Sequence, residues 1–298
     1  MAEPLVKQFP DARPGYPPKL FQFIASKTPS HHLAWDVGTG IGTAAKSVEV
    51  ITVLKFDSVC DIVSDICHVS IVSDSQSPCL AEIYKDVIAT DASEKQLEFA
   101  TKLPNVRYQY TPSTMSMAEV EQMVAPKGTV DLVTVAQAMH WFDLPTFYQQ
   151  VKWVLKKPHG VIAAWCYYLP RVSDAVDTVL DQLYSTEASV YWDSACKLFD
   201  DKYASIEFPF ELVEGADHTG PFEFVTENEM NLDDFLTYIR SWSAYQTAKQ
   251  KGVELLGEDV VKKLKLAWGE DAKKIVKFPV YLRIGRVGNA EHEMITFS

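Results

Sequence analysis

A short stretch after the first apolar run, "DVGTGIG", holds the residues best suited to binding a ligand. Three glycines, Gly38, Gly40 and Gly42, stand where a buried strand should turn into a helix. Because glycine lacks a Cβ atom, the backbone can approach a ligand closely there, and the next helix offers unpaired N–H groups. Asp36 precedes the first glycine by two residues, and Thr43 stands where a dinucleotide-binding loop has its third glycine. The stretch predicts a cofactor loop that departs from the nicotinamide dinucleotide pattern.

The acid expected after such a loop lies far along the chain. In these folds the next strand ends in an acidic residue about 20 residues later, whereas the candidate, Asp91 in "DVIATD", lies 51 residues beyond Gly40. Removing residues 48–79 reduces that separation to 19 residues. It also restores one apolar helical face at i, i+4, i+7 and i+8, made by Ala44, Leu80, Ile83 and Tyr84. The sequence thus predicts an insertion over 48–79 that interrupts the first helix after the glycine loop.

The inserted segment differs in composition from the rest of the chain. It holds three of the five cysteines and drifts from strand-like to helix-like to serine-rich sequence. Our hypothesis is a retained intron or altered splice product translated in frame, with a true structural excursion as the alternative. Sequencing of transcripts across codons 47–80 separates the two. We expect no metal, because no CxxC or HxxxH spacing joins Cys60, Cys67, His68 and Cys79.

Strand-like and helix-like segments alternate around these residues. Apolar or β-branched runs predict buried strands at 33–37, 86–90, 106–110, 130–136 and 160–167. Helical patterns fall between them, one opening on a capping box of Ser93 and Gln96 and one on Asp143 as the N-cap. This order predicts a doubly wound α/β fold, which is a parallel Rossmann-like sheet with helices on both faces.

The whole chain, 1–298, is expected to form one domain. A proline-rich N-terminal arm over 1–30 precedes the first strand, and a helical, aromatic-rich, cap-like region over 170–275 comes late in the chain. After this region, "FPVYLRIGRV" predicts a return to the sheet. The oligomeric state is left open.

Composition narrows the class of partner. The net charge is -12, and no run of lysine or arginine stands out, which argues against a nucleic acid or an anionic membrane surface. The start does not resemble a secretory signal, and the longest apolar-leaning segment carries too many charges to span a bilayer. Five cysteines without a CxxC pair indicate reduced thiols. We expect a cytoplasmic protein with a small-molecule partner.

Four motifs, in order along the chain, carry a family resemblance: "WDVGTGIGTAA", "VIATDASEKQLEFA", "VDLVTVAQAMHWFD" and "VLKKPHGVIAAWCY". Together they resemble class I S-adenosylmethionine (SAM)-dependent methyltransferases of the type-11 group, in particular those similar to plant embryo-abundant proteins and trans-aconitate methyltransferase. The resemblance implies that Gly38 and Gly40 line SAM and that Asp36 lies near its methionine end. It also implies that Asp91 binds the ribose, with Ala92 beside the adenine and Ala136 and Gln137 flanking the sulfonium.

The same resemblance implies where the methyl acceptor binds. His140 and Trp141 in "AMHWF" stand on the acceptor side, and Arg240 and Ser243 in "RSWS" either contact the acceptor or stabilise the cap. A carboxylate acceptor needs no base, whereas a hydroxyl, amine or thiol would need His140 to remove a proton. Methylation of a small carboxylic acid is the first expectation, by analogy with relatives. The alternatives are a catalytically impaired splice form with a disrupted cofactor site and, disfavoured by Thr43, an NAD-dependent oxidoreductase.

Overall fold

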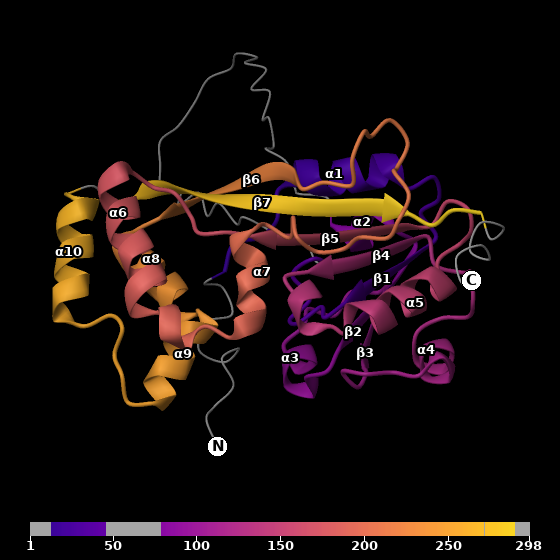
Figure 1. The fold of residues 1–298 in the computed structure, drawn as a ribbon, viewed down its shortest axis with the longest axis horizontal. Coiled ribbons are helices and arrows are strands. Elements are labelled where there is room, and N and C mark those ends of the chain that lie inside the picture. The colour runs from indigo at the N-terminus through magenta and orange to yellow at the C-terminus, as the bar shows by residue number, and fades with distance from the viewer. Residues whose placement is uncertain (1–12, 46–78, 271, 290–298) are drawn as a thin grey trace, which may run out of the picture.

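The fold is built around a seven-stranded sheet (Figure 1). The computed structural model describes residues 13–45, 79–270 and 272–289. The strands are β1 (Leu33–Val37), β2 (Asp86–Asp91), β3 (Val106–Tyr110), β4 (Leu132–Ala136), β5 (Val161–Tyr167), β6 (Phe222–Met230) and β7 (Lys274–Arg286), in the spatial order β3-β2-β1-β4-β5-β7-β6. The first five run parallel, and β7 is antiparallel to both β5 and β6. The predicted doubly wound α/β fold and its five parallel strands are confirmed.

Two apolar layers cover the two faces of the sheet because side chains alternate along each strand. Ala34 of β1 packs on the face covered by α1 (Pro18–Lys27) and α2 (Leu80–Ile83). Trp35, the next residue, packs on the opposite face, with α4 (Met117–Met123) and α5 (Leu144–Val154). The central strands β1, β4 and β5 are buried on both sides, which explains why they read as continuous apolar runs.

Two backbone hydrogen bonds join the turns after the glycine loop to α2, on either side of the segment that the sequence marks as inserted. The Leu80 N–H donates to the Ala44 carbonyl at 3.4 Å, and the Ala81 N–H donates to the Ala45 carbonyl at 3.3 Å. With 32 residues removed, both bonds become α-helical bonds from residue i to residue i−4. The two flanks therefore keep the register that the sequence predicts for the rejoined helix; residues 46–78 lie outside the described part of the chain.

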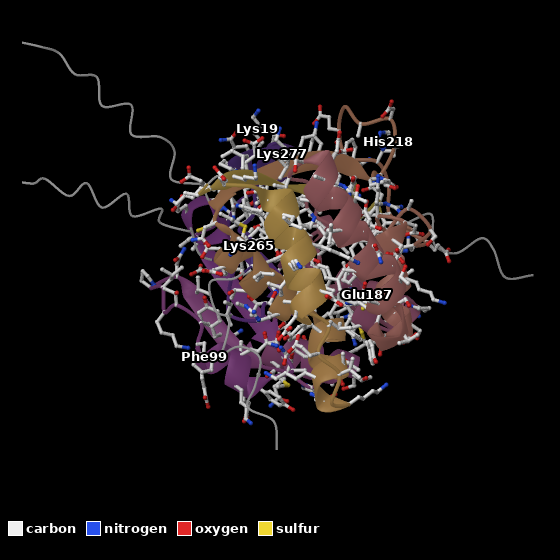
Figure 2. The ribbon with its side chains drawn as sticks, turned by 90° about the vertical axis from the view of Figure 1, so that its left-hand side faces the viewer. Lys19, Phe99, Glu187, His218, Lys265 and Lys277 are labelled. Atoms are coloured by element: carbon white, nitrogen blue, oxygen red, sulfur yellow. The ribbon has the colours of Figure 1, made fainter. Side chains whose placement is uncertain are left out.

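The late region forms a helical body at one end of the sheet (Figure 1). Its elements are α6 (Asp174–Gln182), the π-helical η3 (Leu183–Glu187), the short 3-10 helices η4 (Ser189–Tyr191) and η5 (Ser194–Cys196), α7 (Lys197–Asp200), α8 (Leu232–Arg240), α9 (Ser243–Gln250) and α10 (Glu258–Trp268). Phe235, Trp242 and Trp268 fill its core. Seen from this end, Glu187 and Lys265 lie on the outer face of the cap (Figure 2).

The late region is not wholly helical, because it also contributes β6, which the sequence analysis did not predict. Half-buried and exposed residues alternate along β6, and only its last residue, Met230, is buried, as expected for an edge strand. Helix starts also differ in detail. Ser93 caps α3 (Glu94–Glu98) by accepting from the Gln96 N–H, but its own N–H goes to Asp91 instead of completing the capping box. Asp143 precedes α5, as predicted, without a side-chain capping bond.

Candidate functional site

The predicted cofactor residues gather at the carboxyl ends of β1, β2 and β4. The chain leaves β1 with β2 on one side and β4 on the other, so the strand order reverses at this point. In open α/β sheets, ligands bind in the crevice at such a switch point. The loop after β1 and the turn after β4 both lie there, and they carry Gly38, Gly40 and Gln137.

Backbone geometry requires glycine at the start of the loop. Gly38 has φ +66°, a conformation that is unfavourable for residues other than glycine. A Cβ atom at this position would lie 2.6 Å from the Cβ of Ala138. Gly40 also has positive φ, +60°. The Thr39 N–H between them donates to the Thr90 carbonyl at 2.9 Å. The loop is thus pressed between the ends of β2 and β4.

Asp91 joins the glycine loop directly, despite the distance in sequence. Its carboxylate accepts the Gly40 N–H at 2.8 Å through one oxygen and the Ser93 N–H at 2.8 Å through the other. Each oxygen keeps lone-pair capacity for a further donor, as a ribose diol would require. Ala92, the next residue, is exposed. The predicted pairing of loop and acid is present in the structure.

Asp36, unlike Asp91, is held by side-chain hydroxyls and not by backbone N–H groups. Its side chain is fully buried, and it accepts the hydroxyls of Thr39 at 2.5 Å and Thr134 at 2.7 Å. Burial raises the pKa of Asp36 to about 6, although the two threonine hydroxyls oppose the rise. In this structure Asp36 ties the loop to β4, and Thr134 is a partner that sequence reasoning missed.

The turn after β4 carries a strained residue. Gln137 has φ +58°, and its N–H donates to the Trp165 carbonyl at 2.9 Å. A residue other than glycine in this conformation costs about 1–3 kcal/mol, and such strain clusters at functional sites. The Gln137 Nε2 is buried and has no acceptor. Ala136, which ends β4 opposite Trp165, is half-buried.

His140 lies in η2 (Met139–Trp141), packed against Phe199 with ring centroids 4.1 Å apart. Its Nδ1 lies 3.1 Å from the hydroxyl oxygen of Tyr203. Burial lowers the pKa of His140 to about 4, with Asp193 acting weakly in the opposite direction. The imidazole is therefore neutral at physiological pH and a weak proton acceptor.

Tyr203 was not found from the sequence. It lies in an irregular segment with φ +62°, and its carbonyl accepts from the Arg283 guanidinium at 2.7 Å. Its side chain is fully buried. Tyr203 stands outside any periodic pattern, so the sequence does not mark it as a buried residue. Its backbone is held by Arg283 of β7, which is 80 residues away along the chain.

The other predicted acceptor-side residues are spread out. Trp141 is 56% exposed beside His140. Ser243 is exposed at the start of α9. Burial raises the pKa of Cys196 in η5, and a hydrogen bond with the Ser243 side chain offsets part of that rise. The short helix η5 contacts η2. Arg240 ends α8 beside Tyr245, and no described contact brings it to His140. Trp141 and Ser243 thus flank η5, whereas Arg240 lies apart from them.

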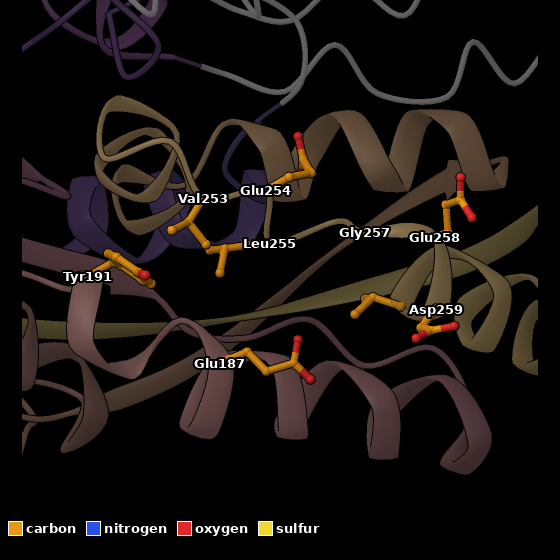
Figure 3. A pocket seen from close by; sticks show the side chains of 9 residues that line it. Glu187, Tyr191, Val253, Glu254, Leu255, Gly257, Glu258 and Asp259 are labelled. Atoms are coloured by element: carbon orange, nitrogen blue, oxygen red, sulfur yellow. The ribbon is translucent and has the colours of Figure 1, made fainter.

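A separate cavity of about 390 Å³ lies within the cap (Figure 3). Its wall is rich in acids from η3 and the start of α10 and includes Tyr191, Val253 and Leu255. None of the predicted site residues lines it. Within residues 13–45, 79–270 and 272–289, no cluster of three or more His, Cys, Asp and Glu side chains is arranged to hold a metal ion. The same ranges contain no helix long and apolar enough to cross a membrane.

Comparison with known proteins gives consistent similarities. A family model described as a methyltransferase domain matches residues 68–164. A protein of Dictyostelium discoideum described as a methyltransferase is 31% identical over 288 residues, which cover 94% of this chain and 92% of that protein. CRG1 of Saccharomyces cerevisiae, described as an S-adenosylmethionine-dependent methyltransferase, is 24% identical over 185 residues, which cover 54% of this chain and 63% of CRG1.

A solved structure is similar over the same extent. The type II methyltransferase of Anaeromyxobacter dehalogenans is 28% identical, with a TM-score of 0.70, and the match covers 93% of this chain and 99% of that chain. The likeness therefore extends over the cap as well as the sheet.

Proposed function

The chain belongs to the SAM-dependent methyltransferases, and on that premise we propose that it methylates the carboxylate of a small-molecule acid. The family assignment favours SAM over the nicotinamide dinucleotide that the glycine loop left open. The narrower kinship with plant embryo-abundant-protein-like and trans-aconitate methyltransferases stays a prediction, as does a cytoplasmic location.

For the cofactor we propose the residues at the switch point. Bound SAM supplies an electrophilic methyl group, so the chain has mainly to hold, orient and desolvate the reactants. Asp91 would accept from the ribose hydroxyls while Gly38 and Gly40 give the backbone room. Ala92 would lie beside the adenine, and Ala136 and Gln137 beside the sulfonium. The free N–H of the buried Gln137 amide supports a polar ligand on this edge.

A matched pair of glycine substitutions tests this placement. Gly38 and Gly128 both have positive φ, but a Cβ atom at Gly128 meets no atom within 4 Å. Gly128→Ala should cost only the backbone strain, about 1 kcal/mol of unfolding free energy, and leave S-adenosylhomocysteine binding unchanged. Gly38→Ala should weaken that binding roughly tenfold or more, about 1.4 kcal/mol, in calorimetric titration. Equal affinities in the two variants would contradict the placement.

The state of His140 supports the carboxylate acceptor. It is a neutral imidazole with a pKa of about 4, and its Nδ1 is engaged by the Tyr203 hydroxyl. A hydroxyl or amine acceptor needs a base that works near neutral pH, and this histidine is a weak one. A carboxylate arrives already ionised, so His140 and Trp141 would only shape and desolvate its binding site. Ser243, beside η5, is proposed as a residue of the acceptor side, and Arg240, which lies apart from it, is proposed to stabilise the cap.

The experiment uses SAM with a tritiated methyl group and matched acceptors. Each small carboxylic acid is paired with the alcohol of the same carbon skeleton. The proposal expects labelled product from the acids, and that label should be released as methanol in mild base, because methyl esters hydrolyse there and methyl ethers and amines do not. Base-stable product from the alcohols or from amines would overturn the carboxylate assignment.

The impaired splice form is the alternative. The bonds from Leu80 and Ala81 to Ala44 and Ala45 support a full chain that keeps its cofactor loop, and we propose that it is active.

A further inference from the structure

Arg13, in the N-terminal arm, reaches the cap from the other end of the chain. Its Nη2 donates to the Ser241 carbonyl, 228 residues away, at 2.8 Å. Ser241 closes α8, so this bond fastens the arm to the cap. Arg13 nevertheless remains exposed to solvent. A guanidinium has five N–H donors, and one carbonyl uses only a small part of that capacity.

Among the residues that the structure describes, Arg13 has no acidic partner, unlike Arg171 and Arg286. Arg171 pairs with Asp181 at 2.8 Å and Arg286 with Glu211 at 2.9 Å. No carboxylate of the described residues lies within ion-pair distance of Arg13. Its neighbours are instead the phenols of Tyr16, Tyr167 and Tyr238, and the Tyr167 hydroxyl is near enough to hydrogen-bond to the guanidinium. Neutral phenols add hydrogen-bond donors and leave the positive charge uncompensated.

This cluster faces the proposed cofactor edge. Tyr167 ends β5, and Tyr16 packs edge-on against Trp165 of the same strand, with ring centroids 5.4 Å apart. The Trp165 carbonyl is the acceptor of the Gln137 N–H. The charge of Asp36 acts on Tyr16 and raises its pKa, although burial is the larger cause. The cluster thus lies between the switch point and the cap.

We propose that Arg13, with the hydroxyls of Tyr167 and Tyr238, forms a carboxylate-binding site between the arm, β5 and α8. A planar guanidinium matches a carboxylate through two parallel N–H bonds, and the phenols can donate to the remaining lone pairs. In a chain of net charge -12, an anionic ligand needs such a local cation. The assignment rests on the proposed function, which brings two carboxylates to this edge: that of the methionine end of SAM and that of the acceptor.

Two nucleoside sulfides distinguish the two sources. S-adenosylhomocysteine carries the amino-acid carboxylate, whereas 5′-methylthioadenosine lacks the amino-acid end. If Arg13 holds the cofactor, Arg13→Gln should lower the affinity for S-adenosylhomocysteine at least tenfold in calorimetric titration and leave the affinity for 5′-methylthioadenosine unchanged. If it holds the acceptor, both affinities stay unchanged, and the KM of the carboxylic acid rises at least tenfold. Arg13→Lys should recover only part of either loss, because an ammonium lacks the paired donors.

Controls separate recognition from folding. Arg286→Gln removes an arginine beside the first residue of β5, at the end of this strand remote from Tyr167. It should change neither the affinity for the nucleosides nor the KM of the carboxylic acid. Tyr167→Phe removes one donor without loss of volume and should give a smaller loss for the same ligand as Arg13→Gln. The assignment would be overturned if Arg13→Gln changed neither the affinity for S-adenosylhomocysteine nor the KM of the carboxylic acid, or if it weakened the binding of both nucleosides equally. A wild-type chain that binds neither nucleoside would overturn the proposed function itself and the assignment with it.

Discussion

Asp36 and Asp91 are both acids at the carboxyl ends of neighbouring strands, yet their oxygens have different partners. Asp91 accepts two backbone N–H groups and stays half-exposed, so it can also face a ligand. Asp36 accepts two threonine hydroxyls and is fully buried. Exposure, together with the hydrogen-bond partners, distinguishes the acid that a ligand can reach from the acid that is buried beneath the loop.

Asp36 and His140 should make opposite contributions to stability as pH changes. The pKa of Asp36 is raised from 3.8 to about 6, so the folded chain binds more protons than the unfolded chain between these values, and its stability falls as pH rises. The pKa of His140 is lowered from 6.5 to about 4, so the folded chain binds fewer protons, and stability falls as pH falls. Each effect amounts to roughly 3 kcal/mol.

Urea unfolding of two variants between pH 4 and 7 separates these contributions. The unfolding free energy of Asp36→Asn relative to wild type should rise as pH increases from 4 to 6, because the cost of the buried charge is gone. That of His140→Gln relative to wild type should rise as pH decreases from 6.5 to 4. Only the slopes are compared, so a constant loss from the substitution does not matter. Slopes equal to that of wild type would refute these pKa shifts.

At the scale of elements, the helix after the glycine loop is the informative one. Its two flanks meet through the N–H groups of Leu80 and Ala81, in the register of a continuous helix. Apolar Leu80 and Tyr84 are buried in the layer that also contains Ala44. The packing that positions Gly40 against Asp91 is therefore supplied by residues on both sides of 46–78.

Deletion of residues 48–79 tests this arrangement. The shortened chain should fold, because Ser47 would then connect directly to Leu80 in helical register. We expect its affinity for S-adenosylhomocysteine to lie within about threefold of that of the full chain, which is under 1 kcal/mol. Calorimetric titration of both forms, with circular dichroism as the check on folding, measures the difference. Binding by the shortened chain alone would establish the impaired splice form instead.

Over the whole molecule, the centre of the sheet was predictable because β1, β4 and β5 are buried on both faces and read as continuous apolar runs. The cofactor loop was predictable because glycine and acid spacing is a local pattern. The edge strand β6 was missed, since only its last residue is buried and it therefore lacks the apolar run by which the central strands were found. Tyr203 and Arg13 act through contacts that span 80 and 228 residues, and no local pattern encodes these pairings.

One strand belongs to both parts of the molecule. Val276 and Phe278, in the first half of β7, pack in the cap core, whereas Val280, Leu282 and Ile284, in the second half, pack in the sheet core. The cap is therefore not a separable module. A chimera that exchanges acceptor specificity between relatives would have to carry β6 and the first half of β7 along with the cap helices. Otherwise Val276 and Phe278 of this chain would have to pack against cap helices from the other protein.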